Sequence, residues 1–153
     1  MSTNFGDILD RKTDDIERPK ALPMGGYIWT IKGLYETGES AQKKTPYVEF
    51  TCVPIQATED VDQDELKATL SRKNGQDKLL GDMTQRLTFY LTEDALWRLK
   101  EFLGHCGIDT DGRTLSSALE DTPGCQFLGN IRHEPSRDGS TIFAKIGNTA
   151  KAE

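Results

Sequence analysis

The sequence is poor in the residues that build metal sites and disulfide frameworks. Of its 153 residues only two are histidines and three are cysteines, and Cys52, Cys106 and Cys125 stand far apart. A structural zinc site needs four ligands at close spacings, so the composition argues against a bound metal, and we expect no cofactor. An odd number of separated thiols is also typical of a protein kept in a reducing cytosol.

Long apolar runs are missing as well. No segment approaches the roughly 18 apolar residues of a membrane span, and the opening stretch, MSTNFGDILDRKTDDIERPK, is too charged for a signal peptide. Hydrophobic residues make up 35% of the chain and charged residues 29%, which is typical of one soluble domain. We therefore expect a cytoplasmic protein with no membrane contact.

Catalytic motifs are also absent. The sequence contains no phosphate-binding Walker loop, no G-x-S-x-G element and no cysteine–histidine pair with a supporting acid. Carboxylates such as Asp60 and Asp62 stand in an acidic run that lacks the apolar surroundings of a general acid. We therefore expect a binding protein and not an enzyme.

The charge distribution raises a question. The net charge is −6, yet Lys43 and Lys44 adjoin in a segment with glycine and serine between two predicted strands. An acidic balance argues against indiscriminate coating of nucleic acid, but a local basic groove is still allowed because binding depends on local potential. The two lysines are either solvated loop residues or part of a surface that binds an anion.

Alternating apolar and polar residues predict five strands. In the second and third strands the alternation places Phe50 and Phe89 toward a core, and Tyr47 and Tyr90 on the opposite face. The strands are predicted in GGYIWTIKGLYE, PYVEFTCVPI, MTQRLTFYL, CQFLGNIRHE and STIFAKIG.

One segment has a clear helical period. In TEDALWRLKEFLGHCGID, apolar residues recur every three or four positions. Thr92 is the predicted N-cap, and Gly107 is predicted to end the helix in the left-handed conformation. Trp29 and Trp97 lie on or beside apolar stripes, so both are predicted in the core.

The order of elements suggests an architecture and its boundaries. We expect residues 1–20 to form a polar arm, 21–148 a single domain with an acidic insertion at 56–83 that includes a short helix, and 149–153 a loose tail. Three strands, one helix and two strands match the OB-fold, a mainly β, five-stranded, partly open barrel with the helix between strands three and four. A generic α+β sandwich with the same elements is the alternative.

Four segments carry a resemblance: LPMGGYIWTIKG, KKTPYVEFTCVPI, RLTFYLTEDALWRLKEFLGHCGID and LEDTPGCQFLGNIRHEPSRDG. From Leu22 to Gly147 the chain resembles a family of small bacteriophage OB-fold proteins that bind single-stranded DNA in replication and recombination. The resemblance implies binding and protection of single-stranded DNA in the cytoplasm of the infected bacterium. Further partners would be a second copy of the chain and phage replication or recombination proteins. The C-terminus, TAKAE, lacks the acidic tip by which bacterial single-strand-binding proteins recruit partners.

In OB-folds, oligonucleotides bind on the face of strands two and three, between the loop joining strands one and two and the loop joining four and five. Single-strand binders combine cations that follow the phosphates with rings on which bases stack. The sequence offers both on this face, although Glu49 adds an unfavourable charge. The predicted nucleic-acid-binding residues are Lys32, Lys43, Lys44, Tyr47, Arg86, Thr88, Tyr90, Arg132 and Arg137.

Two other classes of function fit the same residues. A small β-rich domain with an extended arm also suits a structural phage protein, such as a capsid decoration or tail accessory subunit, because such an arm can bind to neighbouring subunits. A recombination accessory that binds other proteins through the acidic insertion is the second alternative.

Overall fold

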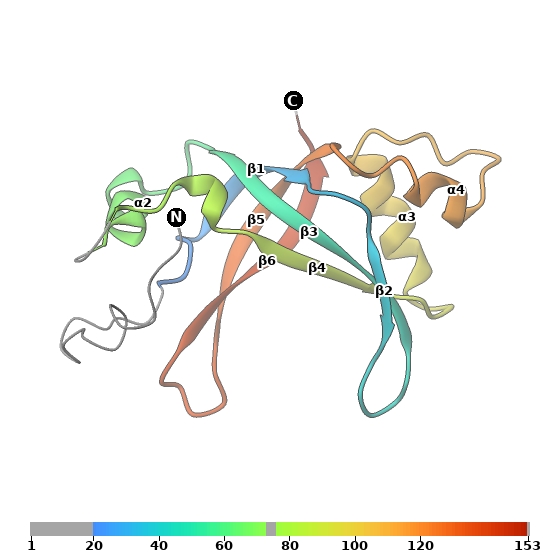
Figure 1. The fold of residues 1–153 in the computed structure, drawn as a ribbon, viewed down its shortest axis with the longest axis horizontal. Coiled ribbons are helices and arrows are strands. Elements are labelled where there is room, and N and C mark those ends of the chain that lie inside the picture. The colour runs from blue at the N-terminus through green and yellow to red at the C-terminus, as the bar shows by residue number, and fades with distance from the viewer. Residues whose placement is uncertain (1–19, 73–75, 153) are drawn as a thin grey trace, which may run out of the picture.

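The structure is a computed structural model, which describes residues 20–72 and 76–152. Its main feature is an antiparallel sheet of six strands, accompanied by short helices (Figure 1). The strands are β1 (Gly25–Ile31), β2 (Glu36–Glu39), β3 (Pro46–Ala57), β4 (Gln85–Tyr90), β5 (Gln126–Pro135) and β6 (Ile142–Lys151). The helices are α2 (Gln63–Leu70), the 3₁₀ turn η2 (Leu80–Asp82), α3 (Leu96–His105) and α4 (Leu115–Leu119).

The sheet is organised around β3, its longest strand. Along one edge β3 pairs first with β2 and then with β1, while β4 pairs with its other edge. Between β1 and β2 the chain passes through Gly33, whose φ of 71° suits glycine. This bend divides the predicted first strand in two, so the prediction of five strands is wrong and the described residues contain six.

The sheet does not close into a barrel. In the described part of the chain β4 pairs only with β3, and β6 pairs only with β5. Helix α3 contacts both β4 and β6, so it occupies the opening that direct pairing of these strands would close. The predicted five-stranded, partly open barrel is therefore not confirmed.

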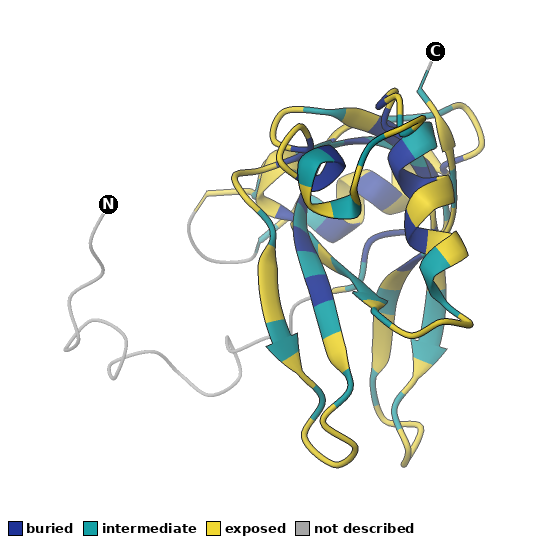
Figure 2. Ribbon diagram, turned by 90° about the vertical axis from the view of Figure 1, so that its right-hand side faces the viewer, coloured by how far each residue is buried: buried dark blue, intermediate teal, exposed yellow. Residues whose placement is uncertain are grey.

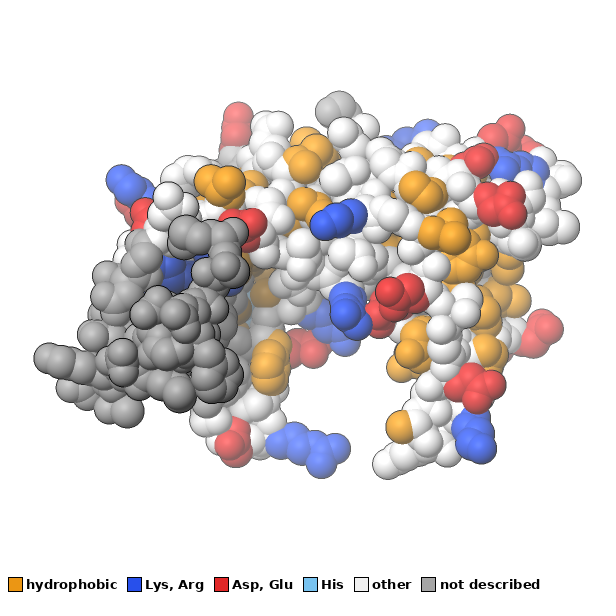
Figure 3. Space-filling model, viewed as in Figure 1, with side chains coloured by type: hydrophobic (Ala, Val, Ile, Leu, Met, Phe, Trp, Pro, Cys, Tyr) orange, Lys and Arg blue, Asp and Glu red, His pale blue; other side chains and the backbone are white. Residues whose placement is uncertain are grey.

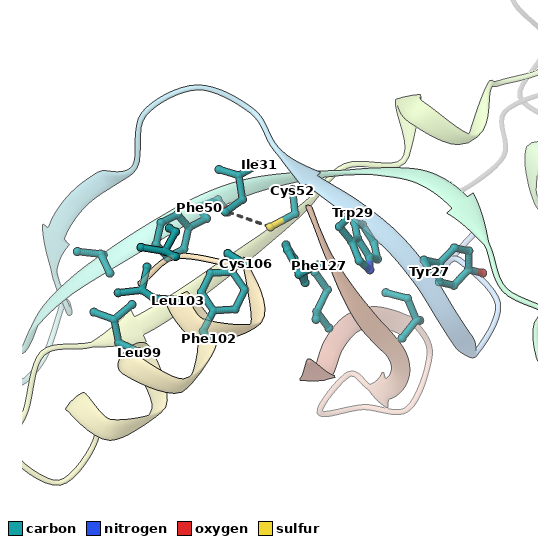
Figure 4. Packing of buried hydrophobic residues seen from close by; sticks show 14 of the residues in the cluster. Tyr27, Trp29, Ile31, Phe50, Cys52, Leu99, Phe102, Leu103, Cys106 and Phe127 are labelled. Atoms are coloured by element: carbon teal, nitrogen blue, oxygen red, sulfur yellow. Dashed lines mark hydrogen bonds between the residues drawn. The ribbon is translucent and has the colours of Figure 1, made fainter. Parts of the chain in front are cut away.

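Phe102 of α3 lies at the centre of the core (Figure 4). Its ring centroid is 5.3 Å from that of Phe50, 4.9 Å from that of Phe89 and 4.9 Å from that of Phe127. Burial of each large apolar side chain contributes about 1.5–3 kcal/mol. The predicted inward orientation of Phe50 and Phe89 is confirmed, since Phe50 is buried and Phe89 packs against the core.

The C-terminal end of α3 follows the prediction, but its start does not. Gly107 has a φ of 82°, and the Ile108 N–H donates to the Leu103 carbonyl at 3.1 Å, which completes a Schellman cap. Thr92 is not the N-cap, because the helix begins at Leu96. The Leu91 N–H still bonds to the Pro46 carbonyl, so the chain needs a turn before it can leave the sheet.

Besides the helix predicted between strands three and four, the described residues also contain α2 and α4, so the fold class with one helix is not confirmed. The short helix predicted in the acidic insertion is confirmed by α2. Helix α2 lies in the acidic insertion, and its start is capped by Asp62 Oδ1, which accepts from the Glu65 N–H at 3.1 Å. Helix α4 has an equivalent cap, in which Thr114 Oγ1 accepts from the Ser117 N–H at 3.1 Å. Such caps satisfy backbone donors that the first turn leaves free, and they allow short helices to persist.

The C-terminal boundary also differs from the prediction. Strand β6 continues to Lys151, which pairs with Phe127, so residues 149–151 are strand and not loose tail. Apart from Lys20, the predicted arm lies outside the described residues. Among the described residues, no helix is both long and apolar enough to span a membrane.

Candidate nucleic-acid interface

Two hairpins project from the body of the molecule in the same direction (Figures 1 and 2). One joins β2 to β3 through residues 40–45, and the other joins β5 to β6 through residues 136–141. Their ends are largely exposed (Figure 2). The space-filling view shows a hollow between them, with basic side chains at both ends (Figure 3). The two loops that the sequence predicts to act together therefore lie on one side of the molecule.

The turn of the first hairpin is built around Ser40. The Ser40 N–H donates to the Thr45 carbonyl at 2.9 Å, and the Ser40 carbonyl accepts from the Lys44 N–H at 3.0 Å. The Ser40 hydroxyl oxygen also accepts from the Thr45 N–H at 2.9 Å. These bonds close the turn with Lys44 at a φ of 52° and leave the side chains of Lys43 and Lys44 exposed.

The turn of the second hairpin is held by Asp138. Its Oδ1 accepts from the Ser136 hydroxyl at 2.6 Å, the Ser140 N–H at 3.0 Å and the Ser140 hydroxyl at 2.8 Å. These hydrogen bonds, the one from the Ser136 hydroxyl first, lower the pKa of Asp138 from 3.8 to about 2. The support that Asp138 gives to the turn is therefore complete above pH 4 and is lost as the pH falls toward 2. Arg137 is exposed within this turn.

The face between the hairpins has the predicted orientation. Tyr47 lies opposite Tyr90 in the pairing of β3 with β4, and the two ring centroids are 6.1 Å apart in an edge-to-face arrangement. Tyr90 is 47% exposed. Gly38 of β2 lies opposite Tyr47, and a Cβ at Gly38 would come within 2.5 Å of the Tyr47 hydroxyl. Gly38 thus makes room for the ring, a role that the sequence does not signal because Gly38 is predicted in a loop and not in a strand.

Glu49 changes the electrostatics of this face. Its Oε1 lies 3.2 Å from Nη1 of Arg86, and its Oε2 accepts from the Thr88 hydroxyl at 2.9 Å. The Glu49 carboxylate thus binds two of the predicted nucleic-acid-binding residues, Arg86 and Thr88. Because the charges of Glu49 and Arg86 cancel, the centre of the face carries no net charge. Positive charge is left at the periphery, and within the described residues the following four side chains form no ion pair: Lys32, Lys43, Lys44 and Arg137.

Arg132 is not grouped with the other predicted residues. Its guanidinium lies 3.8 Å from Glu134, and its side chain packs over Gly147, where a Cβ would come within 2.7 Å of the Arg132 Nε. It lines a groove of about 530 Å³ between β4, α3 and β6. The same groove contains Trp97, which is 58% exposed. The prediction that Trp97 lies in the core is therefore wrong, because its position on α3 faces the opening in the sheet.

The described residues offer little for metal or thiol chemistry. Within residues 20–72 and 76–152, no three His, Cys, Asp or Glu side chains are placed to hold a metal ion. Burial raises the pKa of the Cys52 thiol to about 12, and burial is also the main cause of the rise to about 12 for Cys106. Both thiols are therefore protonated at neutral pH and are poor nucleophiles.

The sequence matches no protein-family model, and no curated protein matches it.

Proposed function

We propose that the protein binds and protects single-stranded DNA during phage replication or recombination, in the cytoplasm of the infected bacterium. The observation that carries the proposal is that two hairpins with unpaired cations flank a sheet face bearing a tyrosine pair, of which Tyr90 is exposed. In this proposal the lysines of the first hairpin and Arg137 of the second contact phosphates, and a base stacks on Tyr90. No catalysis and no cofactor are involved.

We further propose that the fold is an opened variant of the OB-fold. The pairing of strands supports this view, because β1 and β2 together flank β3 as one bent first strand, and β1 also pairs with β5. Helix α3 stands between β4 and β5 in the chain, as the helix of that fold does. The face of β3 and β4 would then be the one on which OB-folds bind oligonucleotides.

Single strands should be preferred over duplex, because the faces of their bases are free to stack on Tyr90. We expect labelled oligo-dT to bind with an affinity that falls as salt rises. Each phosphate contact on a single strand adds about −0.7 to the slope of log affinity against log salt, so four unpaired cations predict a slope of about −3. Fluorescence anisotropy at several salt concentrations measures the slope. Equal affinity for duplex of the same length, or no response to salt, would contradict the proposal.

The stacking contact can be tested at one residue. We expect Tyr90→Ala to weaken oligo-dT binding about tenfold, because stacking on an aromatic side chain contributes about 1–3 kcal/mol per base. Its melting temperature should stay close to that of the wild type, since Tyr90 is exposed at the end of β4. Tyr90→Phe is the matched control, because it keeps the ring and should bind like the wild type. If Tyr90→Ala also binds like the wild type, the ring does not stack on a base.

A structural phage subunit is the second candidate. Ile142 and Phe143 at the start of β6 are 56% and 57% exposed, and adjacent exposed apolar side chains favour contact with another protein. A decoration or tail subunit would leave the anisotropy of oligo-dT unchanged and would bind assembled capsids or tails. The titration described above therefore separates the two candidates.

A further inference from the structure

The groove beside Arg132 lies where the sheet fails to close. Leu87 and Phe89 of β4 line it on one side and Asn148 and Thr149 of β6 on the other, while α3 crosses between them. Its volume of about 530 Å³ is within the range of about 300–1,000 Å³ usual for sites that bind small molecules. The groove is therefore large enough for a nucleotide.

The wall formed by α3 presents an aromatic ring. Trp97 is 58% exposed and lines the groove, and the Arg98 guanidinium carbon lies 5.5 Å from the centroid of its ring. The other tryptophan, Trp29, is fully buried and donates its Nε1–H to the Gly129 carbonyl at 3.0 Å. An exposed indole beside a guanidinium provides the stacking and cation–π partners that nucleobases use.

The charge of the groove is opposite to that of the protein. Arg98 and Arg132 contribute two positive charges, and Glu101 is the only acid among the described residues that line it. Glu134 lies 3.8 Å from both Arg132 and Lys145, so these five charged side chains together carry one positive charge. His105 also faces the groove, with Nδ1 2.8 Å from the Thr149 hydroxyl and Nε2 3.9 Å from Glu101. In a chain with a net charge of −6, this local excess of cations favours an anionic ligand.

We propose that the groove binds a nucleotide of the same DNA strand, with a base stacked on Trp97 and phosphates held by Arg98 and Arg132. The proposal rests on the proposed function and extends its binding site across one strand of the sheet. Arg86, Thr88 and Tyr90 belong to the face described above, while Leu87 and Phe89, which alternate with them on β4, line the groove. A single strand that crosses the unpaired edge of β4 would therefore pass from the face into the groove.

An extended peptide is the competing occupant, because β4 and β6 each have an edge without a partner strand among the described residues. Two observations favour the nucleotide. The charged side chains of the groove, counted with Glu134 and Lys145 beside Arg132, carry a net positive charge, which suits phosphate. Trp97 also offers an exposed ring with a cation beside it. A second copy of the chain docking here would instead make dimerisation depend on Trp97.

Tryptophan fluorescence tests the groove directly. The chain has only two tryptophans, and Trp29 is buried, so a change on adding oligo-dT reports on Trp97. We expect oligo-dT to quench the emission in parallel with the rise in anisotropy. Trp97→Leu should weaken binding about tenfold and abolish the quenching, while the emission of Trp29 remains. Arg98→Gln should make the salt slope shallower by about 0.7. Melting curves of both variants should match the wild type.

The possible outcomes separate this inference from the proposed function. If anisotropy rises without quenching, and Trp97→Leu binds like the wild type, the groove is empty although the face still binds DNA. If Trp97→Leu instead abolishes a concentration-dependent dimer on a size-exclusion column and leaves DNA affinity unchanged, the groove binds protein and the inference is overturned. If oligo-dT changes neither signal, the proposed function fails and this inference fails with it.

Discussion

Replacing Phe102 with alanine is expected to lower the free energy of unfolding by about 3–5 kcal/mol. The side chain is 1% exposed, and its ring contacts three other aromatic rings contributed by three different strands. Its removal would leave a cavity between the helix and the sheet that these rigid rings cannot easily fill. Because domains of this size are typically stable by about 5–15 kcal/mol, the loss would be a large part of the total. Urea denaturation followed by circular dichroism measures it.

Trp97→Ala is the matched control for this experiment. It removes a larger aromatic side chain from the same helix, but Trp97 is 58% exposed, and surface substitutions usually change stability by less than about 0.5 kcal/mol. Alanine also has the highest helix propensity, which offsets part of any lost contact. Equal destabilisation by the two variants would show that α3 does not pack on the sheet through Phe102.

Reversing the charge of the first hairpin should have the largest effect on DNA binding. We expect the double variant Lys43→Glu, Lys44→Glu to weaken oligo-dT binding roughly thirtyfold at moderate salt. An exposed ion pair contributes about 0.2–1 kcal/mol, and two lost attractions plus two new repulsions together amount to about 2 kcal/mol. The salt slope should become shallower by about 1.4, because two phosphate contacts are lost. Fluorescence anisotropy gives both quantities.

The fold should tolerate these two substitutions. Both side chains are exposed, and glutamate at position 44 has the same backbone preference as lysine at the φ of 52° found there. The control is Lys67→Glu with Lys100→Glu, which changes the net charge equally on exposed positions of α2 and α3. If the control weakens binding as much as the hairpin variant, affinity follows the net charge of the protein and the first hairpin is not a specific contact to DNA.

Much of the local structure follows from the sequence. Strand orientation was predictable because side chains alternate between the two faces, so the spacing of Phe50 and Phe89 requires Tyr47 and Tyr90 to lie on the other face. The end of α3 was predictable for a similar reason, since the left-handed residue of a Schellman cap favours glycine and Gly107 supplies it. Both features depend on neighbouring residues alone.

The contents of the candidate site were only partly predictable. The sequence placed Glu49, Arg86 and Thr88 on one face, but their mutual engagement depends on the register between two strands that are separated by the insertion. Trp97 was predicted in the core because it lies beside the apolar stripe of its helix. Its exposure results from the opening between β4 and β6, which no local pattern reveals.

The sequence by itself determined where five of the six described strands lie, which face of each of these is apolar, and where charge and aromatic rings are concentrated. These features depend on the spacing of apolar side chains, which repeat every two residues in a strand and every 3.6 residues in a helix, and on short-range backbone preferences. Only the tertiary structure decided that Gly33 divides the first strand, that the sheet stays open, and that the two hairpins project together. Each of these depends on contacts between residues far apart in the chain, whose energies arise only when the whole core packs around Phe102.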